Sequence, residues 1–112
     1  MKRFFVVLFS ISVFCDLFAQ SDTIPISETI PELYKSQDYQ TVVDLCEQSV
    51  ANGSESAELY YNLGNAYFKM NELSKAILNY EKALLLSPND KDIQYNLAFA
   101  YSQQPDNIEG PG

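Results

Sequence analysis

Two stretches of this sequence repeat each other at a fixed distance, and this repetition restricts the folds open to the chain. Residues 61–67 read YNLGNAY, and residues 95–101, which lie 34 positions later, read YNLAFAY. The same shift towards the N-terminus also aligns similar residues: Lys69 with Lys35, Ile77 with Val43, Glu81 with Glu47 and Leu84 with Val50. A period of about 20–50 residues is typical of proteins built from stacked supersecondary units. We therefore expect one structural unit to recur along the chain.

Each unit is expected to form two helices. Apolar side chains recur at three- and four-residue steps in residues 57–70 and again in residues 73–86, which indicates two amphipathic helices. Asn71 separates them, since asparagine tolerates the left-handed backbone conformation that ends many helices. Pro88 ends the second helix because proline disfavours helix at the preceding residue and lacks an N–H group.

The unit before this one departs from the pattern. Thr29 and Glu32 form a capping-box pattern with Pro31 in the first turn, which predicts a short helix at about 30–36. A second helix is expected at about 39–51, where an Asn-Gly pair follows.

The unit that follows contains only a first helix, expected at about 91–103. Asn89 or Asp90 can cap this helix, and Asp92 in its first turn complements the positive helix end. Pro105 comes soon after its last residues. The chain is therefore expected to be all-α with about five helices, close to the smallest number that forms a stable stack.

Residues 57–90 resemble the tetratricopeptide repeat (TPR) family. The family's signature positions are all matched, by Tyr60, Leu63, Gly64, Tyr67, Ala76, Tyr80, Ala83 and Pro88. The resemblance implies antiparallel helix pairs stacked into a short right-handed superhelix with a concave inner face. The predicted TPR domain spans residues 29–104, with a degenerate repeat at 29–53, the full repeat at 57–90 and a half repeat at 91–104.

The same resemblance implies that the concave face binds a protein or peptide partner. The matching positions form a predicted groove: Tyr61, Asn65, Phe68, Lys69, Tyr95 and Phe99. Aromatic rings provide large contact areas, and asparagine can hydrogen-bond an extended peptide backbone. Some family members hold a partner's terminal carboxylate with asparagines at the positions of Asn65 and Asn96, but they add a basic residue where Tyr61 stands here.

Two further interpretations of these residues stay open. Tyr61 and Asn65 also match the generic family consensus, so they could serve packing alone. Tyr95, Phe99 and Tyr101 lie on a helix that lacks its second partner, which is compatible with a docked partner, with self-association or with a truncated remnant of a larger TPR protein.

No catalytic or cofactor-binding constellation is visible in the sequence. The chain contains no histidine, which removes the Ser-His-Asp and Cys-His arrangements and the usual zinc sites. Residues 89–92 read NDKD but lack the central glycine and closing glutamate of a calcium loop. We expect neither an enzyme nor a bound metal or cofactor.

Residues 1–19 are predicted to be a signal peptide, followed by a flexible leader at 20–28; residues 105–112 are predicted to be a flexible tail. Two cations precede an apolar run that is shorter than the roughly 20 residues of a membrane-spanning helix, and Ala19 suits a cleavage site. A buried N-terminal helix and lipidation at Cys15 are the alternatives, although a bulky Phe14 opposes lipidation.

Without residues 1–19 the chain carries 5 Lys and Arg against 14 Asp and Glu, a net charge of −9. Nucleic acid and anionic lipid bind basic surfaces, so neither is expected as a partner. Cys46 would then be the only cysteine, and it is expected to lie in the core as a small apolar group.

Residues 57–109 are also similar to BatE-type proteins of Bacteroides-like aerotolerance operons. The similarity lies in AILNYEKALLL at 76–86, DIQYNL at 92–97 and DNIE at 106–109, and the Ala19-Gln20 junction suits exported proteins of such bacteria. It implies a periplasmic scaffold, associated with the inner membrane through membrane-bound von Willebrand-type Bat partners, that acts in stress tolerance.

Overall fold

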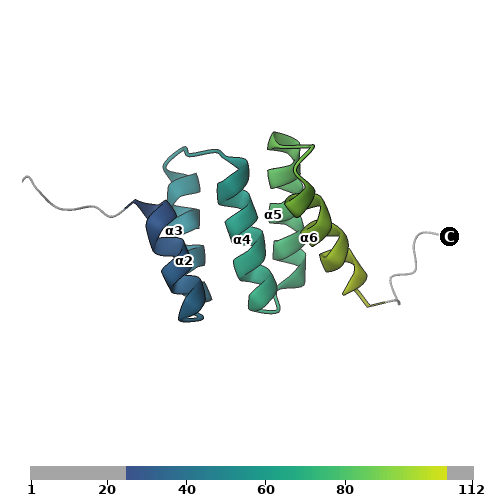
Figure 1. Ribbon diagram of the computed structural model, residues 1–112, viewed down its shortest axis with the longest axis horizontal. Coiled ribbons are helices and arrows are strands. Elements are labelled where there is room, and N and C mark those ends of the chain that lie inside the picture. The colour runs from purple at the N-terminus through teal and green to yellow at the C-terminus, as the bar shows by residue number, and fades with distance from the viewer. Residues whose placement is uncertain (1–24, 106–112) are drawn as a thin grey trace, which may run out of the picture.

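The computed structural model describes residues 25–105, which form a single row of helices (Figure 1). They are α2 (Ile26–Lys35), α3 (Tyr39–Ala51), α4 (Ala57–Lys69), α5 (Leu73–Leu86) and α6 (Lys91–Ser102). Residues 25–105 contain no β-strand, and the prediction of an all-α fold with about five helices is confirmed. The predicted signal peptide, the cleavage site and Cys15 lie outside the described residues, as does the tail beyond Pro105.

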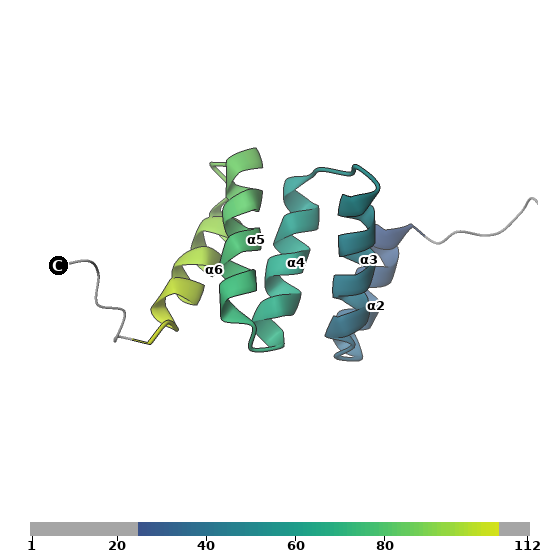
Figure 2. The same cartoon turned by 180° about the vertical axis from the view of Figure 1, so that it is seen from behind.

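Consecutive helices run antiparallel and pack as neighbours along the row (Figures 1 and 2). The most extensive packing joins α4 to α5, and α4 also packs on α3. In turn, α5 packs on α6 and α2 packs on α3. Figure 2, seen from behind, brings α3 and α5 to the front, so that α2 and α6 lie on the opposite side of the row. Among the described helices, none is long and apolar enough to cross a bilayer.

The helix ends follow from side chains that the sequence places at each turn. The Ser56 hydroxyl accepts a hydrogen bond from the Leu59 N–H at 3.1 Å, and Asp90 Oδ1 accepts those of Asp92 and Ile93 at 2.9 and 3.2 Å. Asn71 adopts a φ of 61° between α4 and α5, which confirms its predicted role as a left-handed terminator. These local signals explain why the predicted bounds of α3, α4, α5 and α6 agree with the structure to within one residue.

The predicted start of the first helix was wrong. α2 begins at Ile26, so residues 26–28 belong to a helix and not to the predicted flexible leader. Thr29 is not a capping residue, because it lies inside the helix and its hydroxyl donates to the Pro25 carbonyl at 3.3 Å. Pro25 takes the N-cap position, where its fixed φ of −56° leads directly into the helix.

Pro31 consequently lies beyond the first turn, where its missing N–H costs one helical hydrogen bond. The helix survives because it has a well-packed face: Ile30 is buried, and Leu33 and Tyr34 pack against the core. Tertiary packing therefore outweighs the local disadvantage of the proline, which the sequence pattern alone did not reveal.

The core runs continuously along the row of helices. Seven of the eight TPR signature residues are buried, and the eighth, Pro88, is exposed just after α5 ends. Cys46 is fully buried among them, as predicted, and burial raises the pKa of its thiol to about 11. Asn79 is the one buried polar residue of the described chain, and its amide donates to the Lys75 carbonyl at 2.9 Å.

Two helices approach each other closely where α4 meets α5. A Cβ atom added to Gly64 would lie 2.5 Å from Cδ1 and 2.6 Å from Cε1 of Tyr80, well inside van der Waals contact. Tyr80 is only 2% exposed, and its hydroxyl donates to Asn65 Oδ1, so both ends of this side chain are held. The glycine is therefore required by the tyrosine ring that lies against it.

A tyrosine–glutamate hydrogen bond occurs twice in the stack, at positions 34 residues apart. The Tyr67 hydroxyl on α4 donates to Glu47 Oε1 on α3 at 2.9 Å, and the Tyr101 hydroxyl on α6 donates to Glu81 Oε1 on α5. In each case the first helix of one repeat is joined to the second helix of the repeat before it. The sequence period is thus also a period of hydrogen bonds between repeats.

We expect Gly64→Ala to destabilise the chain by about 1–3 kcal/mol through overpacking, even though alanine is the better helix former by about 1 kcal/mol. Urea unfolding followed by circular dichroism would measure the change. In a Tyr80→Leu background, which removes the ring, the same substitution should become neutral or stabilising. An equal loss in both backgrounds would contradict the assigned contact.

Tyr67→Phe should lower the free energy of unfolding by about 1 kcal/mol, because it removes a partly buried hydrogen bond to a carboxylate. Tyr101→Phe should cost less, since Tyr101 is 44% exposed and water can replace its bond. Chemical denaturation of both variants would test this order, and a larger effect at Tyr101 would contradict it.

Candidate functional site

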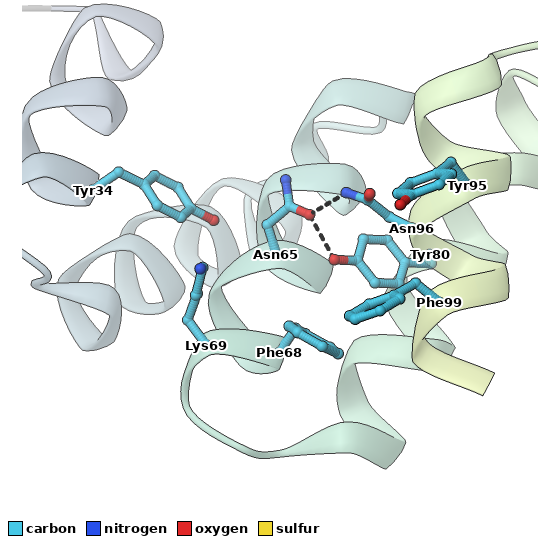
Figure 3. Close-up of a pocket in the computed structure, with 8 residues that line it drawn as sticks. All are labelled: Tyr34, Asn65, Phe68, Lys69, Tyr80, Tyr95, Asn96 and Phe99. Carbon is cyan, nitrogen blue, oxygen red and sulfur yellow. Dashed lines mark hydrogen bonds between the residues drawn. The ribbon is translucent and has the colours of Figure 1, made fainter. Parts of the chain in front are cut away.

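A pocket of about 390 Å³ opens between α2, α4 and α6, with α5 as its floor (Figure 3). Eight residues line it: Tyr34, Asn65, Phe68, Lys69, Tyr80, Tyr95, Asn96 and Phe99. Tyr34 faces Asn65 and Lys69 from one side, and the α6 residues face them from the other. The pocket therefore draws on all three repeats.

Aromatic side chains form most of the pocket wall. The rings of Phe68 and Phe99 pack against each other across α4 and α6, with centroids 5.7 Å apart. Phe99 is nevertheless 47% exposed and Tyr95 is 71% exposed. These rings are held on rigid helices and remain open to solvent, so they can contact a ligand at small entropic cost.

Two asparagines and two tyrosines form a hydrogen-bond network beside this wall. Asn65 Oδ1 accepts from the Tyr80 hydroxyl at 2.5 Å and from Asn96 Nδ2 at 3.0 Å, as Figure 3 shows. Asn96 Nδ2 also donates to the Tyr61 hydroxyl at 3.0 Å. These bonds orient both amides, and within residues 25–105 they leave the Asn65 Nδ2 group and the Asn96 Oδ1 atom without a partner.

Lys69 is the single charged residue among the eight that line the pocket. The ion pairs found in residues 25–105 are Lys35 with Glu32 and Lys75 with Glu72, so the Lys69 ammonium has no carboxylate within ion-pair distance there. The pocket is thus locally basic and apolar, whereas the chain as a whole is strongly acidic.

Burial raises the pKa of two pocket tyrosines, Tyr34 and Tyr80, above the usual value of a phenol. Burial and the hydrogen bond to Glu47 raise the pKa of Tyr67, which is buried and does not line the pocket, to about 12. These hydroxyl groups therefore remain neutral hydrogen-bond donors at physiological pH. They cannot act as bases in that range.

Five of the six residues predicted to form the groove line this one pocket: Asn65, Phe68, Lys69, Tyr95 and Phe99. Tyr61 does not line it. Its ring lies 6.1 Å from the Tyr80 ring, and its hydroxyl accepts from Asn96, so it supports the network from the side. Whether these residues bind a partner stays a prediction.

Three lining residues were missing from the predicted groove. Tyr34 stands 34 residues before Phe68, so the repeat itself contained the signal, and its hydroxyl donates to the Asn62 carbonyl at 3.1 Å. Tyr80 had been considered only as a packing residue, and Asn96 only in relation to a carboxylate. Both reach the pocket through the hydrogen bonds of Asn65, which sequence spacing does not reveal.

The pocket residues offer a ligand apolar contact, hydrogen bonding by amides and one cation, which are the contacts of molecular recognition. Within the described part of the chain, no group of three or more histidine, cysteine or acidic side chains is arranged to hold a metal ion. The tyrosines are neutral, and Cys46 is buried outside the pocket.

Comparison with known families gives one match. Residues 57–90, which contain α4 and α5, match the tetratricopeptide repeat family. The match supports assignment to the TPR family, and the row of five helices in residues 25–105 is consistent with a TPR helical-repeat fold. TPR repeats generally mediate protein–protein interaction, and the family is one of non-catalytic scaffolds. No curated protein matches the chain.

The raised tyrosine pKa values predict that stability falls at alkaline pH. A folded state that holds these protons more tightly than the unfolded state is fully stabilised below about pH 10 and loses that stabilisation as the pH rises towards 12. We expect the free energy of unfolding to fall by about 1 kcal/mol or more between pH 9 and 11. Urea unfolding at each pH would measure it.

Tyr80→Phe should make this pH dependence shallower, because it removes one buried phenol and keeps its ring. Absorbance at 295 nm, which follows phenol ionisation, would show whether the folded chain titrates late. A stability that stays constant through pH 11 would contradict the assigned burial.

Proposed function

We propose that this chain is an exported TPR scaffold that binds an extended segment of a protein partner in the pocket between α2, α4 and α6. The observation that carries the proposal is the oriented amide pair of Asn65 and Asn96 beside an exposed aromatic wall.

The amide pair offers the two kinds of group that a peptide bond requires. The Tyr80 hydroxyl and Asn96 Nδ2 both use Asn65 Oδ1, which directs the Asn65 amide nitrogen away from the network. That nitrogen can donate to a backbone carbonyl, and Asn96 Oδ1 can accept from a backbone N–H. An extended backbone with unpaired groups is the ligand that satisfies both.

The aromatic wall offers a place for the partner's side chains. Phe68, Phe99 and Tyr95 present apolar surface next to the amides, so a large apolar side chain can be buried while the backbone is held. Burial of a side chain such as leucine or phenylalanine contributes about 1.5–3 kcal/mol. Lys69, without a carboxylate of its own within residues 25–105, can pair with an oxygen of the partner.

We also propose that binding takes place in the periplasm, with membrane-bound Bat-type proteins of an aerotolerance complex as the partners. The signal-like residues 1–19 support export, and the similarity of residues 57–109 to BatE-type proteins supports this class of partner. The acidic composition supports a protein partner over nucleic acid or anionic lipid.

Selection of a random peptide library on the chain tests peptide binding directly, with fluorescence anisotropy of the selected peptides as the measurement. The double variant Tyr95→Ala/Phe99→Ala should weaken the Kd about tenfold or more, since it removes much of the aromatic wall. Both side chains are substantially exposed, so the free energy of unfolding should change by less than about 1 kcal/mol.

A matched control removes exposed apolar side chains elsewhere. Leu78 and Leu85 on α5 are 50% and 81% exposed and do not line the pocket. Leu78→Ala/Leu85→Ala should therefore leave the Kd unchanged. Two results would overturn the assignment of the site: an equal weakening of the Kd by both double variants, or selected peptides whose Kd is changed by none of the pocket substitutions.

A further inference from the structure

The outer side of α6 is not covered by any helix within residues 25–105. α6 is the last helix of the described row in both views (Figures 1 and 2). In the complete repeat, α5 covers the corresponding side of α4, where the Tyr80 ring lies against Gly64. The position equivalent to Gly64 on α6 is Ala98, a small residue that is exposed.

Similar residues stand at equal distances before and after Ala98 along α6. At three residues from Ala98 stand Tyr95 and Tyr101, and at four residues stand the polar side chains Gln94 and Ser102. Steps of three and four residues lie on one face of a helix, so these five residues form a single surface, here called the Ala98 stripe. A surface of this kind matches itself when turned by 180° about Ala98.

The polar groups of the Ala98 stripe are mostly used within the protein. Gln94 Nε2 donates to the Pro88 carbonyl at 2.7 Å, the Tyr101 hydroxyl donates to Glu81, and the Ser102 hydroxyl donates to the Phe99 carbonyl. These bonds hold the side chains in place and turn apolar surface outwards. Docking on the stripe would therefore leave few polar groups unpaired.

The Ala98 stripe carries no charged side chain of its own. Residues 93–105 contain no Asp, Glu, Lys or Arg, the longest such run in the described part of the chain. Elsewhere the chain is strongly acidic, so two copies that approached through other surfaces would repel each other. A second copy that approaches α6 meets no charged residue of this helix beyond Asp92, and the carboxylate beside the stripe is that of Glu81, which accepts from Tyr101.

We propose that the Ala98 stripe is a two-fold interface with a second copy of this chain. The two α6 helices cross antiparallel at Ala98, so that Tyr95 of each copy packs on Tyr101 of the other. Such an isologous contact requires a surface that is complementary to itself, which the symmetric spacing around Ala98 provides. Tyr95 belongs both to the stripe and to the lining of the pocket, so a second copy on the stripe would take a contact that the peptide site also uses.

The test places charges on the two-fold axis. Two copies of the full chain with different affinity tags are co-expressed, and the amount of one that co-purifies with the other is measured. Ala98→Lys in both copies should reduce co-purification about tenfold or more, because like charges would meet at the axis, and Ala98→Glu in both should do the same. Combining one copy that carries Ala98→Lys with one that carries Ala98→Glu should restore it.

A second measurement reports the geometry. Ala98→Cys, in a Cys15→Ser background, should form a disulfide-linked dimer under mild oxidation, because the thiol at residue 98 of one chain would lie opposite the same thiol of the second chain. Gln48→Cys on α3, also at an exposed position, is the matched control and should remain monomeric. Cys46 is buried and should not react.

Loss of association in the residue 98 variants can be distinguished from failure to fold and from failure of the peptide site. Ala98 is exposed and does not line the pocket, so its variants should keep the helical circular dichroism of the parent chain and should bind selected peptides no more weakly than the parent. Three results would each overturn the proposed interface: co-purification that is indifferent to charge at residue 98, no rescue by the Lys–Glu combination, or equal crosslinking of the Gln48→Cys and Ala98→Cys variants.

Discussion

The contact between Tyr80 and Gly64 is the interaction on which the rest of this structure depends. The ring lies against a position that has no side chain, which brings α4 and α5 together more closely than any larger residue would allow. The hydroxyl of the same tyrosine donates to Asn65, and Asn65 accepts from Asn96 on α6. A single side chain therefore connects the packing of the complete repeat to the hydrogen bonds of its pocket.

Because of this connection, the pocket is built from the packed helices of the fold and not from loops. Its polar groups are oriented by bonds between three helices, and its aromatic wall by contacts between two. Because this surface is already ordered, binding of a ligand costs little conformational entropy of the protein, which favours affinity even where the contact area is modest. The repeated tyrosine–glutamate bonds contribute to the same rigidity by joining each repeat to the one before.

Two proposed surfaces meet on the last helix. α6 supplies Tyr95, Asn96 and Phe99 to the pocket, and Tyr95 also belongs to the uncharged Ala98 stripe. In a stack of helical pairs, each helix needs neighbours to bury its apolar surface. Within residues 25–105, α6 is the last helix of the row, and the proposed two-fold contact would cover the side that α5 leaves open.

The sequence predicted four of the five described helices with their ends, because these depend on local properties: the spacing of apolar residues, the asparagine and proline at the turns, and the period of 34 residues. The resemblance of residues 57–90 to the TPR family is likewise carried by the sequence. The resemblance to the family pointed to most of the pocket lining, because five of the six positions that it implied lie together there. Only the tertiary structure decided that α2 begins at Ile26 in spite of Pro31, because packing of Ile30 and Tyr34 outweighs a local cost. Likewise, the roles of Tyr34, Tyr61 and Tyr80 depended on which helices lie next to each other. A tyrosine hydroxyl lies several ångströms from its backbone, and what it reaches there is settled by three-dimensional packing and not by spacing along the chain.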